Sequence, residues 1–446
     1  MNLTLQVCAD AARTAGLAVA AVAIGSALAR LLVAGRSRIA WAALLAPWIA
    51  PTLLVSFAYA PLALQLGAFP GATLALYSLA LLLRFVPVAT LILSSLPPRQ
   101  LAADRHAFAL HRSSPWQRLR FRIRGSTAAP VIAGCVVFLL AFADFELASL
   151  WSVKTWTVRV FAAHAGGLAL PESLRLIALP LTIQLLVLAL LAWSARRVSL
   201  GGKWEPLGLI GRRISCGYLG GAALLIALLP ASVIFIRSAP GLAILSAHFA
   251  LGREVLTSLG FALGATLLAL GVTRLTAAWP RPRALLLAAP ALLGALVLSL
   301  LTLALFQLPG WRALYDTPLP LLLTLALLLL PLMLPLQWLR ERDEALHIAQ
   351  TTPSAPAVRR LLWDLDGRRR FLAILLPFCV AYFDFTAGSL LAPMALPPVF
   401  PRLHNLAHYG QTAVLAALLL TALAAPIAVA LPARVWFARW AGRQRD

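Results

Sequence analysis

Acidic residues are scarce in this sequence, and charge of either sign is low for its length. Of 446 residues, 15 are Asp or Glu and 38 are Lys or Arg, so charged residues make up 12% of the chain while hydrophobic residues make up 61%. A chain of this length has room for about two or three soluble domains. A mean hydropathy of +0.88 is too high for them and predicts a polytopic membrane protein.

The excess of positive charge does not indicate a nucleic-acid partner. A formal net charge of +23 would suggest one in a soluble domain. Here the arginines fall between apolar runs, where the positive-inside rule places them. We therefore expect the lipid bilayer, and no nucleic acid, as the partner of this charge.

Cysteines are few and the common catalytic motifs are missing. The 4 cysteines are scattered without metal-ligand spacing, which predicts neither a zinc site nor a disulfide framework. There is no G-x-x-x-x-G-K-[ST] phosphate loop, no nucleophile elbow and no paired-carboxylate site. We expect no enzyme activity and no cofactor. The first residues lack a basic n-region, so no cleaved signal peptide is predicted.

Long apolar runs dominate what is present. Eleven are long enough to cross a bilayer, and backbone polar groups in lipid need the internal hydrogen bonds of helices. Their continuous apolar character excludes the alternation of a barrel, so the predicted fold is all-α. The predicted spans are at about 14–35, 40–66, 70–95, 128–152, 174–194, 215–237, 256–278, 283–306, 317–339, 370–393 and 410–434.

Polar, arginine-rich segments at 97–127 and 340–370 mark an internal repeat. The alignments that define it are His106 to Pro115 on Glu344 to Pro353 (344 − 106 = 238) and Asp144-Phe145 on Asp384-Phe385 (384 − 144 = 240). A period this long predicts two related halves, 1–200 and 201–446, and in a membrane chain it favours a transporter. Each half has a five-helix core, and the span at 215–237 is an added helix. With both segments in the cytoplasm, arginine placement puts the N-terminus outside and the C-terminus inside.

The two polar segments resemble the cytoplasmic loop of permease subunits of ATP-binding-cassette importers. That motif reads Glu-Ala-Ala, three residues, Gly, and later a Pro before the next helix. Glu344-Ala345 matches its start, whereas His106 replaces the motif Glu. Arg112 and Gln350 replace the Gly. By this resemblance the segments hold short helices, ended by Ser-Ser-Pro or Thr-Thr-Pro, that couple the chain to an ATPase. The residues assigned to coupling are His106, Ala107, Arg112, Ser114, Pro115, Glu344, Ala345, Gln350, Thr352 and Pro353.

An alternative is that these segments are solvated loops attracted to anionic lipid. The wider resemblance is to the fused, two-halved permeases of iron(III) and thiamine importers. It is carried by Leu83-Arg-Phe-Val-Pro87, Ala143-Asp-Phe-Glu146 and His408-Tyr-Gly410.

The resemblance implies a multi-pass permease of the bacterial inner membrane for iron(III) or an iron chelate, with thiamine or another small solute as the alternative cargo. It also implies two copies of a separate ATPase beneath the chain and a periplasmic solute-binding protein above it. A rival class is a secondary transporter driven by an ion gradient, with Asp144 and Asp384 as proton or cation sites. A membrane-embedded enzyme is a more distant alternative.

Arg84, Asp144, Glu146 and Asp384 are predicted to lie within the spans. At 1.5 Å per residue, Arg84 is about 18 Å and Asp144 about 24 Å from the cytoplasmic ends of their helices. Charges at such depth are costly unless paired or wetted, which makes these residues candidates for the transport pathway. The alternative is a structural ion pair of Arg84 with Asp144 or Glu146 that locks two helices.

In the outer segments, Arg159 and His164 are echoed by Arg402 and His408. We assign these four residues to docking of the binding protein or to structural capping. His404 adds a further histidine, but ferric iron prefers oxygen ligands to neutral imidazole, so no metal site is predicted.

Overall fold

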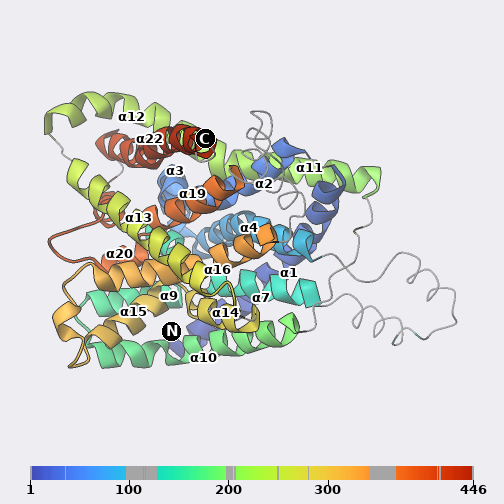
Figure 1. The fold of residues 1–446 in the computed structure, drawn as a ribbon, viewed down its shortest axis with the longest axis horizontal. Helices are drawn as coiled ribbons and strands as arrows, with labels where there is room; N and C mark the ends of the chain where they lie inside the picture. The colour runs from blue at the N-terminus through green and yellow to red at the C-terminus, as the bar shows by residue number, and fades with distance from the viewer. Residues whose placement is uncertain are drawn as a thin grey trace. The chain divides into compact units, whose positions relative to one another are not determined.

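The structure is a computed structural model, and its regular elements are all helical in the part of the chain that it describes (Figure 1). This confirms the predicted all-α fold for those residues. The contacts divide the chain into two compact units, Met1–Val233 and Ile234–Asp446. The described residues are 3–35, 37–96, 114, 116, 128–196, 204, 207–248, 251–279, 281–341, 368–408, 410 and 413–443.

Seven to nine helical stretches in these ranges are long and apolar enough to cross a membrane. Two further predicted spans coincide with the shorter apolar helices Leu319–Leu334 and Phe371–Tyr382, so the count of eleven stays a prediction. The protein is a multi-pass membrane protein by length and composition. The seven stretches that are not bent by more than 40° are Leu3–Val33, Gly71–Ser95, Ala128–Leu150, Leu170–Ala195, Leu209–Leu242, Gly252–Leu275 and Ala413–Val435.

The other two stretches are bent pairs, and each bend has a local cause. Arg38–Ile49 and Thr52–Ala68 meet at 73° because Ala50, which precedes Pro51, is held in an extended conformation with ψ 122°. Leu286–Leu293 and Ala295–Phe306 meet at 107° around Gly294, whose φ of 87° and ψ of 160° suit only glycine.

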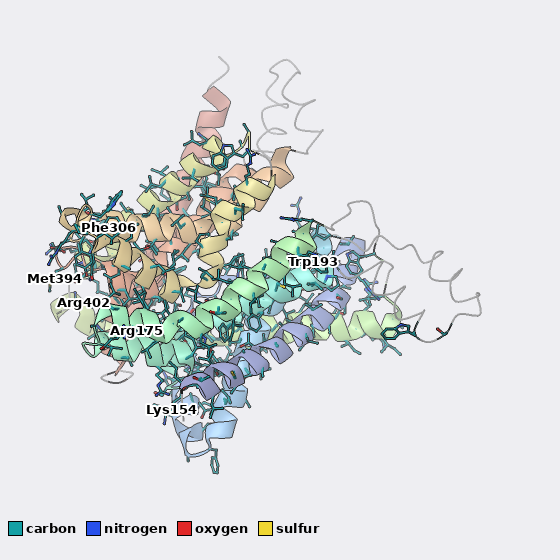
Figure 2. All side chains as sticks on the ribbon, turned by 90° about the horizontal axis from the view of Figure 1, so that it is seen from below. Lys154, Arg175, Trp193, Phe306, Met394 and Arg402 are labelled. Atoms are coloured by element: carbon teal, nitrogen blue, oxygen red, sulfur yellow. The ribbon has the colours of Figure 1, made fainter. Side chains whose placement is uncertain are left out.

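The first unit is built on three mutually packed helices, α1 (Leu3–Gly35), α4 (Pro70–Ser95) and α7 (Ala128–Phe142). Close approach of α1 and α4 depends on Gly25, because a Cβ there would lie 3.1 Å from the backbone nitrogen of Thr90. α10 (Leu170–Ala195) packs against α7, and Figure 2 shows Arg175 and Trp193 near its opposite ends. The remaining elements are α2 (Arg38–Ile49), α3 (Thr52–Gln65), η1 (Leu66–Ala68), α8 (Glu146–Leu150), α9 (Trp156–Ala165), α11 (Leu209–Ala223) and η2 (Leu224–Leu228).

The second unit repeats this order of contacts. α13 (Gly252–Leu275), α16 (Leu319–Glu341) and α19 (Arg368–Tyr382) pack pairwise, and α22 (Ala413–Arg443) packs against α19. α15 (Ala295–Phe306) packs on α20 as α3 packs on α8. The other elements are α12 (Leu229–His248), α14 (Arg281–Ala288), η3 (Ala289–Leu293), η4 (Arg312–Leu314), α20 (Thr386–Leu391) and α21 (Val399–His408).

The helix predicted as the added first helix of the second half lies partly in each unit. Its first part, α11, packs against α1 and α2, and the division between the units falls within α12. The boundary drawn from the repeat at residue 200 therefore differs in position from the boundary drawn from contacts.

Candidate functional site: a polar network at a broken helix

Ala128–Leu150, the fourth candidate span of the first unit, is interrupted near its C-terminal end. α7 ends at Phe142 and α8 begins at Glu146, which leaves backbone carbonyls without helical partners. The first turn of α9 supplies them: Trp156 Nε1 donates to the carbonyl of Phe142 at 2.9 Å, and Thr157 Oγ1 donates to the carbonyl of Asp144 at 2.8 Å. In lipid each such group left bare would cost several kcal/mol, so α9 stabilises the break.

The carboxylate of Asp144 is held from two sides. Its Oδ2 accepts from the hydroxyl of Tyr77 on α4 at 3.0 Å and from the backbone nitrogen of Ala148 at 3.4 Å. The second bond caps α8, whose first N–H groups have no helical partner. Tyr77 is buried, and the ring lies beneath the guanidinium of Arg13, whose Cζ is 5.0 Å from the ring centroid. Asp144 therefore ties α4 to the broken helix.

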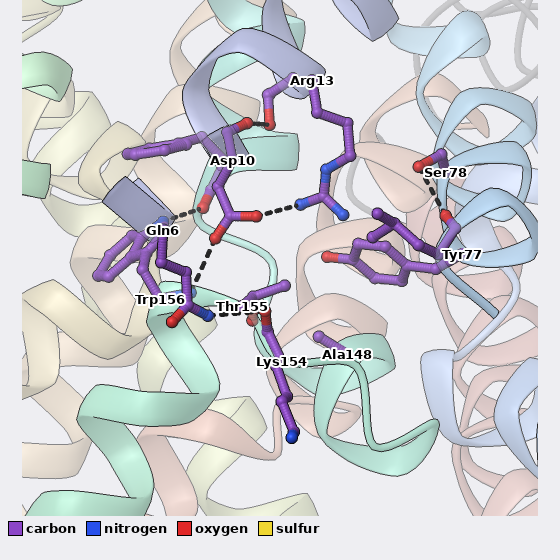
Figure 3. A network of polar contacts seen from close by, with 12 residues as sticks. Gln6, Asp10, Arg13, Tyr77, Ser78, Ala148, Lys154, Thr155 and Trp156 are labelled. Carbon is purple, nitrogen blue, oxygen red and sulfur yellow. Dashed lines mark hydrogen bonds and ion pairs between the residues drawn. The ribbon is translucent and has the colours of Figure 1, made fainter. Parts of the chain in front are cut away.

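The contacts continue to α1 and from there to α9 (Figure 3). Arg13 Nη2 donates to Asp10 Oδ1 at 3.0 Å, and Asp10 Oδ2 accepts from the backbone nitrogen of Trp156 at 2.9 Å. Asp10 is buried. One connected set of polar side chains thus joins α1, α4, the helix break and α9. We call the following residues the polar network: Asp10, Arg13, Tyr77, Asp144, Trp156 and Thr157.

Arg84 lies outside this network. Its guanidinium donates to the hydroxyl of Thr52, the buried first residue of α3. The ion pairs that the described residues show are Asp10–Arg13 and Glu254–Arg402, and the pairing of Arg84 with Asp144 or Glu146 stays a prediction.

The spacing along α4 separates Arg84 from the residue that binds Asp144. Tyr77, which binds Asp144, precedes Arg84 by two helical turns, or about 10 Å along the axis. Arg84 and Glu146 still act electrostatically on Asp144, but neither contacts it as a hydrogen-bond or ion-pair partner in the described structure. The pathway role of Arg84, Asp144, Glu146 and Asp384 stays a prediction.

The second unit has a matching break between α19 and α20. Asp384 Oδ2 accepts from the backbone nitrogens of Ala387 at 2.9 Å and Gly388 at 3.2 Å, and so caps α20. A ring contact below the break is also repeated. The centroids of Phe145 and Phe161 are 4.3 Å apart, and those of Phe385 and His404 are 4.0 Å apart.

In both units the short helix after the break, α9 or α21, is bound to the first helix at two points. The two units align here at 254 − 6 = 258 − 10 = 248 on the first helix and 402 − 159 = 399 − 156 = 243 on the short helix. The matched contacts are Asp10 with the backbone nitrogen of Trp156 and Ser258 with that of Val399 (2.8 Å), and Gln6 with Arg159 (3.5 Å) and Glu254 with Arg402.

We call these contacts between the first helix and the short helix the tether. Its carboxylate is at a different position in the two units. In the first unit it is Asp10, which caps α9, and in the second it is Glu254, one turn earlier, which pairs with Arg402. Arg159 and Arg402, assigned from sequence to docking or capping, are thus the two arginines of this contact. Their assignment to docking or capping stays a prediction.

The histidines have separate surroundings. His164 Nδ1 lies 3.0 Å from the hydroxyl of Ser173, and partial burial lowers the pKa of His164 below its ordinary value of 6.5. His404 is buried against Phe385, and the side chain of His408 is outside the described residues. No group of three or more His, Cys, Asp or Glu side chains suited to a metal ion occurs in the described part of the chain.

Only Ser114 of the predicted coupling residues is described, and it is exposed. The other nine lie outside the described residues: His106, Ala107, Arg112, Pro115, Glu344, Ala345, Gln350, Thr352 and Pro353.

Sequence reasoning missed Asp10, Arg13 and Tyr77. The first predicted span began at residue 14, whereas α1 begins at Leu3 and carries Asp10 and Arg13 within its apolar stretch. One signal was present, because an acid and a base three residues apart face the same side of a helix. Tyr77 gave no signal, since its role depends on a residue 67 positions away.

Searches of protein-family models, curated proteins and solved structures with this chain gave no match.

Proposed function

We propose that this chain is the permease subunit of an ATP-driven importer and carries both halves of the permease in one polypeptide. The observation that supports it best is the repeated architecture. Each unit has three packed helices, and the third is interrupted by a break at which an aspartate caps the helix that follows. A short outer helix is bound to the first of the three. In both units the predicted coupling segment, 97–127 or 340–370, connects the second of those packed helices to the broken one.

The geometry suits a transporter that transmits force. Closure of two ATPase subunits would displace the coupling segments and, with them, the adjoining ends of α4 and α7. The polar network links α4 and the break to α1 and α9, so that displacement reaches the outer helix. At Asp144 and Asp384 a helix is interrupted, and the aspartate caps the helix that follows.

Under this proposal two copies of a separate ATPase bind the coupling residues, and a periplasmic solute-binding protein docks on the outer segments that hold Arg159, His164, Arg402 and His408. The chain lies in the bacterial inner membrane, with the N-terminus outside. It has no catalytic role of its own and needs no cofactor. Iron(III) or an iron chelate is the proposed cargo, with thiamine or another small solute as the alternative. Both cargo proposals rest on the resemblance of the segments Leu83 to Pro87 and Ala143 to Glu146 to the permeases of iron(III) and thiamine importers.

A secondary transporter is the second candidate, because Asp144 and Asp384 both lie at breaks of candidate spans, where such proteins bind coupling ions. The two classes differ in their energy source. Uptake into proteoliposomes should require ATP and the ATPase subunit under the first proposal, and a proton or cation gradient alone under the second.

The sharper test uses the unequal coupling motifs. Glu344 keeps the motif acid and His106 does not, so Glu344→Ala should lower substrate-stimulated ATP hydrolysis in the assembled complex more than His106→Ala. Ser94→Ala, at the end of α4 before the segment, is the matched control and should leave hydrolysis unchanged. The importer proposal would be wrong if the chain co-purified with no ATPase and uptake were driven by an ion gradient alone.

A further inference from the structure

Several arginines of the first unit lie where three packed helices, α1, α2 and α11, begin or end. α1 ends at Gly35, α2 begins at Arg38, and α11, which packs against both helices, begins at Leu209. Arg38 lies in the first turn of α2, and Arg212 and Arg213 lie in the first turns of α11; all three are exposed.

These first turns lie at the same end of the packed helices. α2 leads through its bend into α3, where the hydroxyl of Tyr59 donates to the carbonyl of Leu225 in η2 at 2.6 Å. The downstream part of one helix therefore meets the downstream part of the other, and α2 and α11 run in the same direction. Their arginines consequently share one surface.

Trp204 joins α1 to this surface. Its indole Nε1 donates to the carbonyl of Leu93 near the end of α4 at 3.1 Å, and the guanidinium of Arg30 lies 5.5 Å from its ring centroid. The Leu93 carbonyl is one that a helix end leaves free. We call Arg30, Arg38, Arg212 and Arg213 the arginine corner.

Apolar side chains are exposed directly beside these arginines. Ile39 is 81% exposed, Ile210 76% and Ile214 68%. Each is within two residues of an arginine of the corner. A surface that combines arginine, tryptophan and exposed aliphatic residues is typical of the boundary between lipid chains and headgroups.

The chain supplies no carboxylate to this surface from the helices that form it. The sequence has no acidic residue between Asp10 and Asp104 or between Glu205 and Glu254. Within the described residues no arginine of the corner takes part in an ion pair, and the buried Nε of Arg30 has no hydrogen-bond partner. The helices that carry these arginines therefore supply no negative charge to balance them, and an anionic ligand can supply it.

We propose that the arginine corner binds the phosphate of an anionic phospholipid headgroup, with the acyl chains against Ile39, Ile210 and Ile214. Guanidinium groups bind phosphate oxygens in pairs of parallel hydrogen bonds, which suits several arginines around one headgroup. The exposed aliphatic side chains favour a lipid over a free anion, because a free anion gains nothing from them. This site is independent of the proposed transport function.

The test counts lipids retained by the purified full chain, by native mass spectrometry, after exchange into equimolar phosphatidylglycerol and phosphatidylcholine. The wild-type protein should retain phosphatidylglycerol preferentially, and R38Q/R212Q/R213Q should lower that preference by up to about a hundredfold. R175Q/R237Q/R312Q removes the same charge from exposed positions elsewhere and should keep the preference. Millimolar inorganic phosphate should not displace the lipid.

Three results would overturn the proposal. They are no preference in the wild-type protein, an equal loss in the control variant, and displacement by inorganic phosphate. The absence of a preference in the wild-type protein overturns the proposal even if the triple variant does not fold. R38K/R212K/R213K keeps the charge and loses the paired geometry, so it should retain an intermediate preference.

Discussion

The backbone nitrogen of Trp156 donates to the carboxylate of Asp10 at 2.9 Å, across 146 positions of sequence. Through this contact one aspartate performs two tasks, since its other oxygen pairs with Arg13. The same tryptophan covers the break in the fourth span through its indole nitrogen. These contacts therefore fix the positions of α1, the break after α7 and α9 relative to one another.

The first prediction concerns Asp10. Asp10→Ala should destabilise the protein by up to about 3–5 kcal/mol, because it leaves the partly buried guanidinium of Arg13 without its partner. Asp10→Asn should cost less, since the amide oxygen still accepts from Trp156. Thermal unfolding in detergent checks this, with the exposed Asp316→Asn as the control. Additive losses in a cycle of Asp10→Asn with Arg13→Gln would argue against the pair.

A second prediction concerns the break in the helix. Trp156→Phe keeps the ring but removes the bond to the Phe142 carbonyl, which should lower the free energy of unfolding by about 1–3 kcal/mol. Thr157→Val should act in the same way on the Asp144 carbonyl. Trp279→Phe, at a half-exposed position, should change little. Unchanged stability in both variants would mean that α9 does not hold the break.

The third prediction compares the two tethers. Arg402 is 40% exposed in its pair with Glu254, so Glu254→Gln should cost at most about 1 kcal/mol and leave the kind of contact that Gln6 makes with Arg159. Glu254→Leu should cost more, because it removes every acceptor. Chemical denaturation of both variants decides the order, and equal losses would show that charge alone matters.

A fourth prediction follows from His164. Its pKa is lowered by burial, so the unfolded chain binds this proton more readily than the folded protein. The contribution of neutral His164 is complete above pH 6.5 and is lost as pH falls through that value toward the lower folded pKa. His164→Gln should therefore flatten the decline of the unfolding midpoint between pH 7 and pH 5.5. An identical decline in the variant would exclude His164 as its source.

The last prediction concerns topology. With an odd number of spans and the coupling segments inside, a cysteine-accessibility map should place residue 5 outside and residue 440 inside. If both residues react from the same side, one span has been miscounted, and the shorter helix Phe371–Tyr382 is the first to reconsider.

The class of this protein and its helical structure follow from the sequence alone. Long apolar runs in lipid leave the backbone no other way to satisfy its hydrogen bonds, and helices make up most of each predicted run that the structure describes. The two-half symmetry stays a prediction, and the structure bears on it at one pair of positions. Asp144-Phe145 and Asp384-Phe385 mark equivalent breaks, and both aspartates cap the helix that follows.

Only the tertiary structure shows which residues the charged side chains within the helices contact. Depth along a helix can be counted in residues, but the direction of a side chain and the level of its neighbour depend on how helices pack. Arg84 binds Thr52 because α3 lies beside it, while Asp144 meets Tyr77 two turns away from Arg84. Asp10 lies beside Trp156 only because α9 folds back against α1, and no local pattern in either segment contains that contact.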